Sequence, residues 1–227
     1  MSTSLQQDKL PQAVLFDWDN TLVDTWPVII KSMNRTLEHM GREPWTEEEG
    51  KARIDRSLRD SFPDFFGQRW QEAMQIYYDF FSESHLEMLS PLPSSLDVVR
   101  YLAQNGVWTA VVSNKTGRFL RAEAQHLGWD SHFQRLVGAG DAEFDKPDIA
   151  PVHMALEGAG FGPDSQVWFV GDKAIDLKCA SLSGCSGILM QPDPPAAGDF
   201  SQWPPRAVFG GCCEFLSFLR TLPIPIS

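Results

Sequence analysis

The hydrophobic positions of this chain fall into short, nearly continuous apolar runs that are separated by stretches with helical spacing. Continuous runs, as opposed to strict alternation, are typical of strands covered on both faces of a parallel sheet. Strands that alternate with helices predict a doubly wound α/β fold with right-handed crossovers. The predicted strands are 13–18, 108–114, 135–140, 166–172, 186–190 and 207–210.

Segments with helical spacing lie between these strands. Gly106 and Gly128 follow two of them and are usual helix stops, because glycine readily adopts the left-handed backbone that ends many helices. Pro151 falls in the first turn of another segment, where backbone N–H groups have no partner within the helix. The predicted helices of this part of the chain are 94–106, 117–128, 148–160, 174–184 and 212–222.

A helical insert interrupts the alternation directly after the first strand, because the stretch that follows contains no strand-like run. Thr46 followed by Glu49 forms a capping box at the start of one of its helices. The helices predicted in the insert are 28–41, 46–62 and 69–89. We therefore expect an α/β core and an inserted all-helical cap, with the core formed by 1–24 and 91–227 and the cap by 25–90.

Composition narrows the class of protein. The formal net charge of −11 argues against partners such as nucleic acid or an anionic membrane, since both favour a basic face. No apolar run is long enough for a signal peptide or a membrane span. The four cysteines form no C-x-x-C pair and favour reduced thiols over a zinc site. We expect a cytoplasmic protein, either a monomer or a homodimer.

Polar residues stand where the predicted strands end. Carboxylates that converge at one sheet edge repel each other unless a cation lies among them, and oxygen ligands suit Mg²⁺. A hydroxyl, an amide and a lysine beside such a metal are donors for an anion, which favours phosphoryl transfer. Asp17 is placed to attack phosphorus and Asp19 to carry a proton. The residues concerned are Asp17, Asp19, Ser113, Asn114, Lys146, Asp172 and Asp176.

Each of these residues also has an ordinary structural interpretation. Asp17, Asp19 or Asp172 is a common turn residue after a strand, and most lysines like Lys146 are solvated. These interpretations are plausible separately but weak jointly, because each strand end would need an unrelated explanation.

Four segments resemble, in order, the motifs of the haloacid dehalogenase-like hydrolase superfamily. They are "DWDNT" (17–21), "VVSN" (111–114), Lys146 within "DKPDIAPV", and "GDKAID" (171–176). The resemblance spans most of the core, and the insert looks like the cap of many phosphatases in this superfamily. Asn20 stands where glycine is frequent, and asparagine tolerates the left-handed backbone nearly as well.

The resemblance implies a role for each site residue. Asp17 is expected to be the nucleophile, which forms an aspartyl-phosphate and binds Mg²⁺. Asp19 is expected to protonate the leaving group and then activate water, with its backbone carbonyl on the metal. The remaining implied roles are phosphoryl binding by Ser113 and Asn114, charge neutralisation by Lys146, metal binding by Asp172, and metal binding or ligand orientation by Asp176.

The substrate implied is a small phosphorylated metabolite. The chain looks most like phosphoglycolate phosphatase and its relatives, so 2-phosphoglycolate is the first candidate. A sugar-phosphate mutase of the same fold and a non-catalytic binding protein remain open as alternatives. In the insert, the segment 52–60 places Arg56 with Arg53 where a basic helix face can reach a substrate, although pairing with neighbouring acids is the favoured interpretation.

Overall fold

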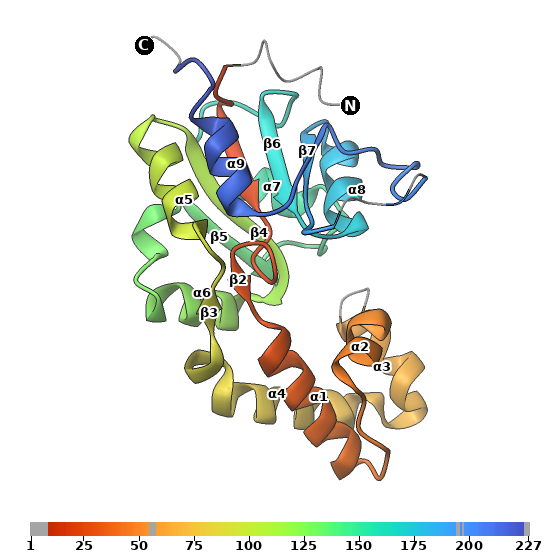
Figure 1. Cartoon of the computed structure of the whole chain (residues 1–227). Helices are drawn as coiled ribbons and strands as arrows, with labels where there is room; N and C mark the ends of the chain where they lie inside the picture. The colour runs from red at the N-terminus through yellow and green to blue at the C-terminus, as the bar shows by residue number, and fades with distance from the viewer. Residues whose placement is uncertain (1–8, 55–57, 194–195, 197, 225–227) are drawn as a thin grey trace. The chain divides into compact units, whose positions relative to one another are not determined.

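The structure is a computed structural model that describes residues 9–54, 58–193, 196 and 198–224. Its contacts divide the chain into two compact units (Figure 1). Unit 1 comprises Met1–Val23 and Pro91–Ser227, and unit 2 comprises Asp24–Ser90. The division falls one residue from the one that the sequence pattern suggests.

Unit 1 is built on a parallel sheet of six strands in the order β5-β4-β1-β6-β7-β8. Every predicted strand is present, with ends that differ by at most a few residues. β1 lies between β4 and β6, and Phe16 at its end is in register with Val111 and Val170. The strands are β1 (Ala13–Phe16), β4 (Trp108–Thr116), β5 (Arg135–Ala139), β6 (Val167–Gly171), β7 (Ser186–Met190) and β8 (Ala207–Phe209).

Helices cover both faces of this sheet, which confirms the doubly wound fold. α5 and α9 pack on one face, and α7 and α8 on the other (Figure 1). α6 follows β4 and contacts both β4 and β5. The helices are α5 (Ser95–Gln104), α6 (Gly117–His126), α7 (Ala150–Ala155), α8 (Ala174–Ser183) and α9 (Cys212–Leu219), with a short 3₁₀ turn η2 (Asp130–His132) before β5.

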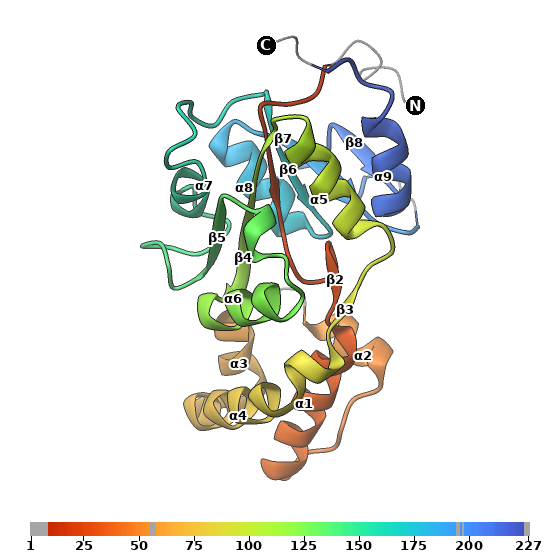
Figure 2. The same cartoon turned by 90° about the vertical axis from the view of Figure 1, so that its left-hand side faces the viewer.

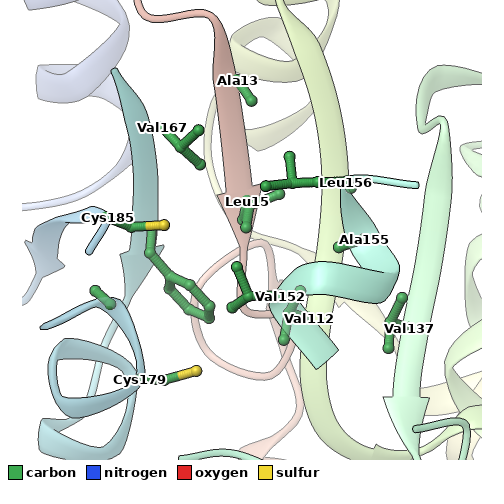
Figure 3. Packing of buried hydrophobic residues seen from close by; sticks show 13 residues of the cluster. Ala13, Leu15, Val112, Val137, Val152, Ala155, Leu156, Val167, Cys179 and Cys185 are labelled. Carbon is green, nitrogen blue, oxygen red and sulfur yellow. The ribbon is translucent and has the colours of Figure 1, made fainter. Parts of the chain in front are cut away.

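The apolar run of β1 is continuous because both of its faces are buried. Ala13 and Leu15 point into a cluster with residues of α7 and α8, such as Val152 and Cys179 (Figure 3). Burying apolar side chains from both faces stabilises the fold by roughly 1.5–3 kcal/mol for each large side chain. The strand is therefore fixed on two sides, and the residues that follow it start from a rigid position.

Unit 2 is helical, as the sequence predicts. Figure 2 shows its helices as a compact group, in which α1 and α4 lie against each other. Aromatic side chains of α3 and α4 form much of its interior, with the ring centroid of Tyr77 at 5.6 Å from Phe62 and 5.8 Å from Phe81. The elements are α1 (Trp26–His39), α2 (Glu47–Arg53), α3 (Leu58–Phe66), η1 (Gly67–Arg69) and α4 (Trp70–Met88).

Two predicted helices are wrong in extent. The capping box of Thr46 and Glu49 is present, but α2 ends at Arg53 because Ile54 leaves the helical region (φ −91°, ψ 71°). α3 then continues through Pro63, beyond the predicted end at residue 62. The helix predicted over 148–160 is limited to α7, because the backbone turns through glycines with positive φ further along, such as Gly158 (φ 88°).

The two segments that connect the units pair with each other. β2 (Val23–Asp24) and β3 (Ser90–Pro91) form a separate two-stranded sheet. The N–H of Leu92 also donates to the carbonyl of Leu22, at 3.0 Å. Among the described residues, no helix is both long enough and apolar enough to cross a membrane.

Candidate active site

The candidate site lies at the carboxyl ends of the central strands. In an open parallel sheet, ligands bind where the strand order reverses, and here this point is β1. Asp17 follows β1 directly, and its N–H donates to the carbonyl of Val170 at 2.8 Å. Asp172 follows β6, while Ser113 lies within β4. The sheet thus brings Asp17, Ser113 and Asp172 to one edge.

A tight turn after β1 places Asp19. The carbonyl of Trp18 accepts hydrogen bonds from the N–H groups of the next residues, including that of Leu22 at 3.0 Å. Asn20 has a φ of 61°, which is the left-handed backbone expected of it. The turn therefore begins directly after Asp17 and contains Asp19, so the two carboxylates acquire different surroundings.

Lys146 is the buried cation nearest to Asp17. Its Nζ lies 2.9 Å from Asp17 Oδ1 and 2.7 Å from Asp176 Oδ1, and its side chain is 2% exposed. Although burial disfavours the charged amine, the charges of Asp17 and Asp176 raise the pKa of Lys146 well above its ordinary value. Lys146 is therefore an ammonium at all physiological pH values.

Asn114 fixes the backbone of Lys146. Its Nδ2 donates to the Lys146 carbonyl at 3.0 Å, and its Oδ1 accepts from the Lys146 N–H at 2.9 Å. The amide of Asn114 thus holds the loop that carries the lysine. Ser113 is buried beside it, and its Oγ accepts from the N–H of Lys115 at 3.3 Å.

Asp17, Asp172 and Asp176 form a carboxylate cluster in which one oxygen of each residue lies within 4.8 Å of one oxygen of the other two. Burial raises the pKa of Asp172 well above its ordinary value, and the neighbouring Asp176 and Asp17 raise it further. Within the described part of the chain, Asp172 Oδ1 is buried and has no hydrogen-bond partner. A hard cation would satisfy that oxygen and relieve the repulsion, so the cluster fits Mg²⁺.

Asp176 differs from the other two members of the cluster. Its Oδ1 accepts from Lys146, and its Oδ2 accepts from the backbone N–H of Lys173 at 3.0 Å. Gly171 permits this approach, because a Cβ at that position would lie only 2.3–2.4 Å from the Asp176 side chain. With both oxygens already engaged, Asp176 is better suited to orient its neighbours than to bind a metal directly.

Replacing Asp172 with asparagine is expected to affect the metal-free and metal-bound proteins in opposite directions. Because the pKa of Asp172 is raised in the fold, its ionisation destabilises the metal-free protein increasingly as the pH rises above the ordinary range of an aspartate. Without Mg²⁺ the variant should unfold roughly 3 °C higher than the wild type at neutral pH. With saturating Mg²⁺ the wild type should be the more stable, as measured by differential scanning calorimetry.

Asp193→Asn is a matched control for this measurement, because Asp193 is exposed and lies outside the carboxylate cluster. It should respond to Mg²⁺ as the wild type does. Equal stabilisation of the wild type and of Asp172→Asn by Mg²⁺ would contradict the assignment of Asp172 to the metal site.

Lys115 is a second buried lysine in this region, and none of the sequence motifs singles it out. Its Nζ lies 2.5 Å from Asp19 Oδ1 and 2.9 Å from Glu123 Oε2. Trp18 is fully buried and donates from Nε1 to Glu123 Oε2 at 2.7 Å. The sequence did contain one signal for this buried pair. Glu123 lies on the same helix face as the apolar Phe119 and Leu120, and a buried glutamate needs a cation as its partner.

Arg56, the predicted substrate-binding residue of the insert, lies outside the described residues. Its neighbour Arg53 is exposed, pairs with Glu49 at 3.4 Å and stacks over the ring of Trp45. The expected pairing of this segment's arginines with Asp55 and Asp60 involves side chains outside the described residues, so it stays a prediction.

Comparison with known proteins agrees with this geometry. A model of the haloacid dehalogenase-like hydrolase family matches residues 14–190, a range that includes every residue of the site. The chain belongs to the haloacid dehalogenase-like hydrolases. The resemblance inferred from the four sequence motifs is therefore confirmed.

Among the similar curated proteins, some are named phosphoglycolate phosphatases and others pyrophosphatases. The chain is 28% identical over 191 residues to a phosphoglycolate phosphatase of Pseudomonas putida, covering 79% of this chain and 70% of that protein. It is also 28% identical over 177 residues to the pyrophosphatase PpaX of Bacillus velezensis, covering 78% of this chain and 82% of that protein.

Solved structures show the same fold. A haloacid dehalogenase-like family protein of Streptococcus pneumoniae superposes with a TM-score of 0.81 at 20% identity, over 92% of this chain and 98% of that chain. A hydrolase of the superfamily from Ehrlichia chaffeensis gives a TM-score of 0.65 at 26% identity, over 95% of this chain and 99% of that chain.

Proposed function

We propose that the protein is a Mg²⁺-dependent phosphatase that hydrolyses a small phosphate ester through a phosphorylated Asp17. The observation that carries the proposal is the position of Asp17 between a buried lysine and two further carboxylates. Oδ1 of Asp17 is held by Lys146, and no described residue donates a hydrogen bond to Oδ2. Oδ2 is thus available to attack phosphorus.

The reaction follows from the distribution of charge. As an oxygen of Asp17 bonds to phosphorus, the ester P–O bond breaks and its electron pair remains on the leaving oxygen. Lys146 would stabilise the charge of the phosphoryl group, and Ser113, within β4 beside β1, would donate a hydrogen bond to it. Asp19 gives its proton to the leaving oxygen and later takes one from the water that hydrolyses the aspartyl-phosphate.

The surroundings of Asp19 suit this proton transfer. Burial raises the pKa of the Asp19 carboxyl above its ordinary value, even though Lys115 opposes the shift. A carboxyl with a raised pKa retains a proton nearer to neutral pH and is a better acid for the leaving group there. Asp17 precedes this turn, at the end of β1, and is left to act as the nucleophile.

Mg²⁺ is proposed as the cofactor on the basis of the carboxylate cluster. Asp17 and Asp172 would hold the ion, with Asp176 orienting them and the Asp19 carbonyl as a further ligand. Bound there, the ion would neutralise phosphoryl charge and align the ester with Asp17. The four cysteines are free thiols, which supports the cytoplasm as the proposed location.

The named relatives suggest two substrates. 2-Phosphoglycolate comes first, because a phosphoglycolate phosphatase is among the relatives that match most of the chain. Pyrophosphate comes second, because a pyrophosphatase is equally identical over a similar length. Both are small and anionic, as the proposal of a small phosphorylated metabolite requires.

The proposal predicts that the purified protein hydrolyses p-nitrophenyl phosphate with Mg²⁺ and loses at least about 100-fold of that rate in EDTA, because the carboxylate cluster needs its cation. Released phosphate is measured, and restoring Mg²⁺ should restore the rate. Phosphoglycolate, hexose phosphates, nucleotides and pyrophosphate are then compared by kcat/KM.

The same assays separate the alternatives. A mutase would convert a sugar phosphate to its isomer while releasing little phosphate. A binding protein would shift in melting temperature with a phosphorylated ligand and release none. Either result would contradict the proposed phosphatase activity.

A further inference from the structure

The two neighbouring aspartates of the site are paired with different lysines. Lys146 holds Asp17, whereas Lys115 holds Asp19 through Oδ1. Asp19 stands outside the cluster formed by Asp17, Asp172 and Asp176. The second lysine therefore belongs to the proton carrier and not to the nucleophile or the carboxylate cluster.

Lys115 is itself firmly held. Its side chain is 4% exposed, and its second partner, Glu123, is fully buried in α6. The indole N–H of Trp18 donates to the same Glu123 oxygen that pairs with Lys115. Trp18 in turn packs edge-on against Trp129, with ring centroids 5.9 Å apart. If Lys115 left this position, the buried carboxylate of Glu123 would lose its compensating charge, which is costly. Lys115 is therefore held in the position that the structure shows.

The partners of Lys115 favour its charged form. Although burial disfavours the charged amine, Asp19 and Glu123 raise the pKa of Lys115 above its ordinary value. Lys115 thus donates to Asp19 as an ammonium. Among the described residues, the other oxygen of Asp19, Oδ2, has no hydrogen-bond partner, and the side chain is 24% exposed.

We propose that Lys115 is a positioning residue for Asp19, and that Glu123 and Trp18 hold Lys115 in place. By occupying Oδ1, Lys115 fixes the carboxyl plane and leaves Oδ2 as the oxygen that carries the proton. The inference rests on the proposed phosphatase function, because it assigns Lys115 a part in delivering the proton of Asp19 to the leaving group.

The role has a kinetic consequence that depends on the leaving group. When an oxygen of Asp17 displaces an alkoxide, the electron pair of the broken P–O bond must be protonated by Asp19. When it displaces p-nitrophenolate, the anion is stable and needs no proton. A poorly positioned Asp19 therefore slows alkyl esters selectively, whereas general damage to the site slows both kinds of ester alike.

The test compares kcat/KM for Lys115→Met and the wild type on p-nitrophenyl phosphate and on an alkyl phosphate. kcat/KM reports the steps up to departure of the leaving group, so the later hydrolysis of the aspartyl-phosphate does not obscure it. The alkyl ester is 2-phosphoglycolate, or otherwise the first alkyl phosphate that the wild type hydrolyses. We expect a loss of about 100-fold on the alkyl ester and less than about 5-fold on p-nitrophenyl phosphate.

Further variants keep the test decisive. Lys115→Arg retains a cation and should recover part of the alkyl-ester rate. If Lys115→Met does not fold, the double variant Lys115→Met with Glu123→Gln removes both charges of the buried pair and should show the same selective loss. Lys178→Met, on α8 outside the site, should leave both rates unchanged.

The outcomes separate this inference from the proposed function. Equal losses on both esters, or no loss on either, would overturn the positioning role while leaving the phosphatase proposal intact. If the wild type hydrolyses neither ester with Mg²⁺, the proposed function fails and the positioning role fails with it.

Discussion

Replacing Asp17 with asparagine should lower kcat/KM for phosphate esters by at least about 10⁴-fold. Asparagine has nearly the same shape, but its neutral amide oxygen is a poor nucleophile and forms no stable phosphorylated intermediate. Lys146 also pairs with Asp176, at 2.7 Å, so in this variant the lysine should keep one of its anions and the fold should remain intact. Phosphate release with Mg²⁺ measures the effect, and circular dichroism verifies the fold.

Asp130→Asn provides the matched control, because Asp130 is an exposed aspartate of unit 1 outside the site. It should retain the wild-type rate. An Asp17→Asn protein that is folded and hydrolyses esters at a rate close to that of the wild type would rule out Asp17 as the nucleophile.

Replacing Lys146 with methionine should reduce both activity and stability. The carboxylate of Asp176 is 1% exposed, and without the ammonium it shares a buried site with Asp17 and no compensating cation. We expect the free energy of unfolding to fall by about 3–5 kcal/mol in the metal-free protein. We also expect kcat/KM to fall by at least about 10³-fold, because the phosphoryl charge loses its fixed cation. Urea denaturation and phosphate release measure the two effects.

Mg²⁺ provides an internal check on this variant. Because the ion adds positive charge to the same carboxylate cluster, it should restore part of the lost stability but little of the activity. Lys9→Met, at an exposed position, should change neither. A Lys146→Met protein as stable as the wild type without metal would show that the buried pairs contribute less than the geometry indicates.

The fold could be predicted from sequence because its signals are local and agree with one another. Each strand buried on both faces leaves a continuous apolar run, as in 13–16, and each helix between strands leaves its own spacing and stop. Residues next to the ends of neighbouring parallel strands meet at the switch point, so the approach of Asp17 and Asp172 follows from topology. Lys146 lies in a loop seven residues after β5 ends at Ala139, and topology alone does not place it.

The rest depended on contacts between distant segments. The pairing of Lys115 with Glu123 joins β4 to α6, and no spacing rule distinguishes a lysine that turns inward from a solvated one. The end of α2 at Arg53 is set by the backbone of Ile54, which the helical pattern continued through. The contacts of Asn114 were not predictable from the sequence either. Its amide was expected to bind the phosphate, but it forms hydrogen bonds with the backbone of Lys146.

Trapping the phosphorylated protein tests the central claim most directly. The wild type is mixed with substrate and Mg²⁺, quenched in acid, and reduced with borohydride, which converts an aspartyl-phosphate to homoserine. Peptide mass spectrometry should find homoserine at position 17 in the wild type and at no position in Asp17→Asn or in protein without substrate. Turnover of the substrate with no homoserine at position 17, or with homoserine at another aspartate, would contradict the account.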